Sequence, residues 1–176
     1  MTTFTIEVKD EGVQAALQAL LQRTQNLAPV LTALGDEIVE RTKQRFGTSS
    51  GPDGAPWAPH SIATLAMAAG ALGKGYRRKD GGLNARGKKK LASKKLLVDS
   101  GFLRSNIFPS VSGNTLTIGA TAQYAAIHQF GGQAGRGRKV SIPARPFLPV
   151  LADGTLYPQE QTLVLQTLND FLMDGL

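Results

Sequence analysis

Two histidines are the side chains best suited to acid–base chemistry, and neither has partners at a useful spacing. His60 stands in a proline-flanked loop and His128 within the apolar stretch YAAIHQF. No paired-histidine metal spacing is present, and the chain has no cysteine, so disulfides and thiolate metal sites are excluded. We therefore predict that both histidines are structural and that the protein uses no metal or other cofactor.

Two short stretches look like catalytic motifs but fail the full pattern. The stretch GALGKGY, residues 70–76, looks like a phosphate loop. A Walker A motif needs Gly and Ser or Thr where this sequence has Ala68 and Gly75. Ser100, within DSG, lacks the flanking glycines of a nucleophile elbow and is better suited to a turn or cap. We predict a protein without enzymatic activity.

The charge is unevenly distributed along the chain and favours binding over catalysis. The formal net charge is +7, and residues 55–152 contain 15 of the 20 Lys and Arg residues but only two of the 13 acidic ones. The order along the chain is therefore acidic, basic, acidic. A basic centre can face nucleic acid, an acidic protein, or the acidic part of a second copy in a head-to-tail contact.

Half of the basic residues lie between residues 74 and 95, interleaved with glycine and with almost no large apolar residue. This composition predicts a flexible basic insert that adds nothing to the core. Three roles remain open: a solvated loop, contact with an acidic protein, and contact with the DNA backbone. Tyr76 is the sole aromatic, so base stacking is not favoured. The basic residues are Lys74, Arg77, Arg78, Lys79, Arg86, Lys88, Lys89, Lys90, Lys94 and Lys95.

Hydrophobic periodicity predicts the elements that position these residues. Alternating apolar residues indicate strands, and a turn of Ser112, Gly113 and Asn114 between two of them is typical of a β-hairpin. Apolar residues at helical spacing, with capping residues ahead of them, indicate helices. The predicted strands lie near residues 3–9, 106–111, 115–119 and 139–143, and the predicted helices cover about 10–22, 29–47, 62–72 and 158 onward.

Length and composition predict a single domain over residues 1–176. Apolar residues make up 41% and aromatic residues 6% of the chain, which suits one modest core. We predict an α+β fold in which a small, mainly antiparallel sheet packs against two longer helices, with a long basic loop. The N-terminus does not resemble a signal peptide and no run reaches membrane-spanning length, so no membrane contact is expected.

Five short motifs occur in an order and spacing that resemble the phage virion morphogenesis family, also called the tail-completion family. The resemblance covers about residues 30–172. The motifs are RF at 45–46, PDGAPW at 52–57, DSGFLR at 99–104, YAAIHQFGG at 124–132 and IPARPFL at 142–148.

The resemblance implies a structural protein that finishes the tail and lets it join a filled head. It would act as a ring in the neck, with six copies as the expected number, beside tail terminator and head–tail connector proteins. It would reside in the virion neck or tail, and in the host cytoplasm during assembly. The alternative is a basic, DNA-binding accessory protein of a phage or prophage.

The joined segments 124–132 and 142–148 are predicted to form the main assembly contact. Trp57 serves either as a loop anchor or as an interface hot spot. Pro143 and Pro146 restrict the chain around Arg145, so Phe147 either plugs a neighbouring subunit or closes the core of its own. The predicted interface residues are Trp57, Tyr124, His128, Phe130, Arg136, Arg138, Lys139, Arg145 and Phe147.

Overall fold

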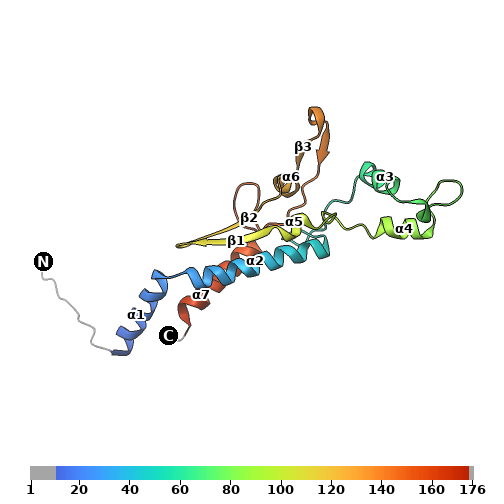
Figure 1. Cartoon of the computed structure of the whole chain (residues 1–176). Coiled ribbons are helices and arrows are strands. Elements are labelled where there is room, and N and C mark those ends of the chain that lie inside the picture. The colour runs from blue at the N-terminus through green and yellow to red at the C-terminus, as the bar shows by residue number, and fades with distance from the viewer. Residues whose placement is uncertain (1–10, 175–176) are drawn as a thin grey trace.

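A computed structural model describes residues 11–174, and the predicted strand at 3–9 lies outside this range. Its central element is helix α2 (Ala28–Thr48), which has proline in its first turn and buries one face that is apolar except for Thr42 and Arg45. The hairpin of strands β1 (Ile107–Ser112) and β2 (Thr115–Ala120) lies along that helix (Figure 1). The predicted hairpin and the predicted helix at 29–47 are confirmed.

The hairpin approaches α2 closely at one glycine. A Cβ atom added to Gly35 would lie 2.8 Å from Cβ of Pro109 and 2.9 Å from Cδ1 of Leu116. Neither distance leaves room for a methyl group, so only glycine allows this approach. The spacing between helix and hairpin therefore depends on one residue of α2.

Two further helices, α1 (Glu11–Gln25) and α7 (Pro158–Met173), confirm the predictions for residues 10–22 and 158 onward. α7 packs against both α1 and α2. Nη1 of Arg23 donates to the carbonyl oxygen of Leu172 at 2.9 Å, which ties α1 to the C-terminal end of α7. α1 buries no residue and α7 buries only Glu160, so this end of the molecule contributes little to the core.

Residues 61–95, here called the basic arm, extend beyond the C-terminal end of α2 (Figure 1). The arm contains α3 (Ile62–Gly70), the short 3-10 turn η1 (Lys74–Tyr76) and α4 (Ala85–Ala92). The hydroxyl oxygen of Ser61 caps α3 by accepting from the backbone N–H of Thr64 at 3.1 Å, as its sequence position predicts.

The segment predicted as a basic loop contains a helix that sequence patterns did not show. Oδ1 of Asn84 caps α4 by accepting from the N–H of Gly87 at 2.9 Å. The Arg77 guanidinium donates to the carbonyl oxygens of Ala69 and Gly81, both at 2.8 Å. Hydrogen bonds from polar side chains thus hold the arm together locally, so α4 forms without a stripe of apolar residues. Its flexibility stays a prediction.

The sheet differs from the single small sheet that was predicted. Strand β4 (Val140–Ile142) pairs with β3 (Gly132–Ala134) in a second hairpin, separate from β1 and β2. Gly137, with φ of 71°, turns the chain inside the 3-10 turn η2 (Arg136–Arg138) at the tip of this hairpin. The strand near 139–143 is therefore present but joins a partner that the sequence did not indicate. The α+β class itself is confirmed.

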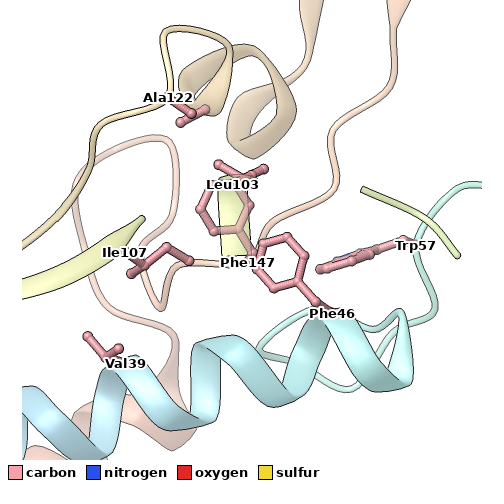
Figure 2. Packing of buried hydrophobic residues seen from close by; sticks show 8 residues of the cluster. Val39, Phe46, Trp57, Leu103, Ile107, Ala122 and Phe147 are labelled. Carbon is pink, nitrogen blue, oxygen red and sulfur yellow. The ribbon is translucent and has the colours of Figure 1, made fainter. Parts of the chain in front are cut away.

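The core lies where the C-terminal half of α2 meets the loops and two short helices, α5 (Phe102–Ser105) and α6 (Ala125–Phe130). Figure 2 shows the side chain of Phe46 rising from α2 toward Trp57 and Phe147. Its ring centroid is 5.5 Å from that of Trp57 and 5.4 Å from that of Phe147. The buried cluster consists of Val39, Phe46, Trp57, Leu103, Ile107, Ala122, Ala125 and Phe147.

Candidate functional site

The Trp57 loop and the IPARPFL segment are joined by reciprocal hydrogen bonds. Nε1 of Trp57 donates to the carbonyl oxygen of Pro146 at 2.9 Å. In return, Nε and Nη2 of Arg145 donate to the carbonyl oxygens of Ala58 and Pro59 at 2.7 and 2.8 Å. Trp57 and Arg145 are both buried. These two residues, predicted as interface contacts, thus act inside the chain as anchors between two loops.

Gln129 holds the same segment from the other side. Its Oε1 accepts from the N–H groups of Phe147 and Leu148, both at 2.9 Å. Its Nε2 donates to the carbonyl oxygens of Leu148 and Val150 at 3.2 and 3.0 Å. The side chain of Phe147, held in this way, is 0% exposed. It therefore closes the core of its own chain, which was the alternative to an interface plug.

A buried charge cluster links α2 to α7. Oε1 of Glu160 accepts from Nη2 of Arg45 at 2.5 Å and from Nη2 of Arg41 at 2.9 Å. Nη1 of Arg45 also donates to the carbonyl oxygen of Phe147 at 2.8 Å. Burial lowers the pKa of Arg45, because desolvation outweighs the stabilising charge of Glu160. The RF motif therefore makes two contacts: the Phe46 ring packs in the core, and the Arg45 guanidinium holds α7 against α2.

Two of the aromatic residues predicted as interface contacts are exposed, and they lie on α6 or beside it. Tyr124 and Phe130 are exposed, and the Tyr124 ring lies edge-on to His128 with centroids 5.8 Å apart. Burial, and secondarily the charge of Arg145, lower the pKa of His128 and so favour the neutral form of the ring. The structure thus brings Tyr124, His128 and Arg145 together at one groove.

A groove of about 830 Å³ separates the basic arm from the body. Its walls include Thr64 and Met67 from α3, and Phe102 and Tyr124 from the body. The other histidine, His60, also lines the groove, and its Nε2 lies 3.3 Å from the carbonyl oxygen of Lys94 at the root of the arm. The basic arm is therefore connected to the body near His60 and Lys94, and the groove separates α3 from the body.

Basic side chains are exposed on two projections. Arg136, Arg138 and Lys139 are exposed at the tip of the β3–β4 hairpin. In the basic arm, Arg77 is used in local hydrogen bonds and Nζ of Lys94 pairs with Asp99 at 2.9 Å. The exposed basic residues of the arm are Lys74, Arg78, Lys79, Arg86, Lys88, Lys89, Lys90 and Lys95.

Sequence reasoning missed Gln129 and Glu160. Gln129 is the polar residue on the buried face of a short apolar helix, which is a signal for a structural amide. Glu160 had no comparable signal, because its arginine partners lie more than 100 residues away. Within residues 11–174 no group of three or more acidic or histidine side chains could hold a metal ion. None of the described helices is both long enough and apolar enough for a bilayer.

Comparison with known proteins places this architecture in a family. The sequence profile of the phage virion morphogenesis family matches residues 8–168. The "Mu-like prophage FluMu G protein 2" of Haemophilus influenzae is 44% identical over 167 residues, which cover 94% of each chain. No solved structure matches the chain.

The chain belongs to the phage virion morphogenesis family. Its role therefore lies in the assembly of phage particles.

Proposed function

We propose that the chain is a structural, non-enzymatic subunit that completes the tail and joins it to the head. It acts in the neck of the particle, as a ring beside tail terminator and head–tail connector proteins. The observation that carries the proposal is the pair of exposed basic projections on a body whose loops are tied together by buried hydrogen bonds. A stiff body with projecting contacts suits a subunit that must touch several neighbours.

The separate acidic and basic parts of the chain support a closed ring. A two-fold contact uses the same surface on both copies, so one such contact joins only two copies. A head-to-tail contact instead pairs unlike surfaces, and closing the ring satisfies every copy. We take six copies as the number, from the resemblance of the chain to tail-completion proteins.

The decisive experiment removes the gene from the phage or prophage. We expect filled heads and finished-length tails to accumulate separately in electron micrographs, and joined particles to return when the wild-type protein is supplied in trans. The neck of complemented particles should contain a cyclic oligomer of this chain. Infectious, joined particles made without the protein would contradict the proposal.

The exposed lysines of α4 support a second candidate, contact with the DNA backbone. Such contact releases counterions, so affinity for a DNA duplex would fall steeply as the salt concentration rises. The second candidate requires this dependence and requires it to weaken when the lysines are replaced. Absent or salt-insensitive binding would remove it.

A further inference from the structure

We propose that the basic arm of one copy docks on the exposed face of helix α2 of the next copy, where Asp36, Glu37 and Glu40 lie. The inference rests on the proposed function, because it needs several copies side by side. The basic arm and the acidic face of α2 are the two surfaces that meet in the ring.

The acidic side of this contact is built by the helical period of α2. Leu34 and Ile38 are buried on one side of the helix, which leaves Asp36, Glu37 and Glu40 exposed on the other. Neither Asp36 nor Glu37 has an ion-pair partner within residues 11–174. Neighbouring like charges repel each other on a helix surface, and a cationic partner would relieve that repulsion.

The basic side is α4, a helix whose Lys and Arg side chains its own chain leaves exposed. Arg86, Lys89 and Lys90 lie three and four residues apart, so they share one face of the helix, and all three are exposed. Arg86 and Lys90 are one turn apart, as are Asp36 and Glu40 on α2. Two helices with charges at the same axial spacing of about 6 Å can form ion pairs in register.

The arm also has apolar surface, which favours a protein partner over DNA. α3 packs beside α4, and its Ile62 and Met67 are 88% and 77% exposed. A DNA backbone would leave these side chains in water, whereas a protein surface can cover them. Figure 1 shows the arm beyond the C-terminal end of α2, and Asp36, Glu37 and Glu40 are exposed, so the arm does not cover the acidic face of its own chain. A second copy supplies the missing surface.

Charge reversal with rescue tests the contact in the full-length protein. We expect Arg86→Glu with Lys90→Glu, or Asp36→Lys with Glu40→Lys, to raise the protein concentration needed for half-assembly by roughly tenfold or more. Combining all four substitutions in one chain should restore assembly, because the ion pairs re-form with opposite signs. Native mass spectrometry at several salt concentrations gives the oligomer mass.

A matched control separates this contact from a general effect of charge. Arg136→Glu with Arg138→Glu makes the same change in net charge on the β3–β4 hairpin. Added to Asp36→Lys with Glu40→Lys, this pair should not restore assembly. Rescue by the hairpin pair as well would overturn the specific contact.

Carbodiimide cross-linking of assembled particles tests the contact in its own setting. We expect peptides containing Lys88, Lys89 and Lys90 to be joined to peptides containing Asp36 and Glu40 of another copy. If particles contain the protein without this cross-link, the inference is overturned, while the head–tail role stands or falls by the gene deletion alone. Loss of DNA binding in the arm variants, with unchanged oligomer mass, would assign the arm to DNA and also overturn the inference.

Discussion

Glu160 is the only described residue of α7 that is buried, and it is a charge. Its Oε1 serves both Arg41 and Arg45, while its Oε2 is buried without a hydrogen-bond partner. Removing one member of a buried ion pair costs more than the pair itself contributes, because the remaining charge stays desolvated. The attachment of α7 to α2 therefore depends on a polar contact where an apolar one is usual.

We predict that Glu160→Ala lowers the free energy of unfolding by ~3–5 kcal/mol, because Arg45 is left buried without its partner. Urea denaturation followed by circular dichroism measures this. Asp170→Ala is the matched control on the exposed side of α7, with an expected change within about 0.5 kcal/mol. If both substitutions lower the free energy of unfolding by the same amount, the buried charge cluster does not stabilise the attachment of α7.

Sequence patterns identified Arg45, Phe46, Trp57 and Phe147 as important residues without giving their partners. Each makes its defining contact across a long stretch of chain, as between Trp57 and Pro146, 89 residues apart. Local spacing contains no information on such pairs. The sequence left Trp57 and Phe147 open between a core role and an interface role, because large aromatic side chains suit both.

At the scale of elements, the contact of the β1–β2 hairpin with α2 depends on Gly35. We predict that Gly35→Ala destabilises the protein by about 1–3 kcal/mol, because the added methyl group pushes the hairpin off the helix. Gly47→Ala in the same helix meets nothing within 4 Å and should be neutral or stabilising by up to ~1 kcal/mol. Thermal melting of both variants gives the comparison, and a stabilising Gly35→Ala would contradict the close approach.

Elements with a strong local signal were predictable from sequence, and elements held by distant or polar contacts were not. The helices at 29–47 and 158 onward and the first hairpin each have an apolar period of their own. Helix α4 is rich in lysine and depends on the Asn84 cap, so its pattern looks like a loop. The pairing of β4 with β3 requires the reversal at Gly137, which period-two alternation does not show.

At the scale of the whole molecule, the basic arm should be the first part to yield to protease. We predict that trypsin cuts the isolated subunit first between residues 78 and 95, because the arm has only local contacts and opens at low cost in free energy. Arg45, which is buried, serves as an internal control and should be cut last. Assembly should slow cleavage of the arm, and first cuts outside the arm would contradict the prediction.

Gly87 is the only buried residue between residues 61 and 95. Its neighbours there are Tyr76 and Leu83, which belong to the arm itself. Substitutions in the arm therefore leave the core untouched, whereas the chain from 145 to 148 is fixed by hydrogen bonds at almost every residue. Substitutions in the arm can thus accumulate at little cost to the stability of the body. Grafting an arm from a relative should therefore leave the recipient folded and change only the contact that the arm makes.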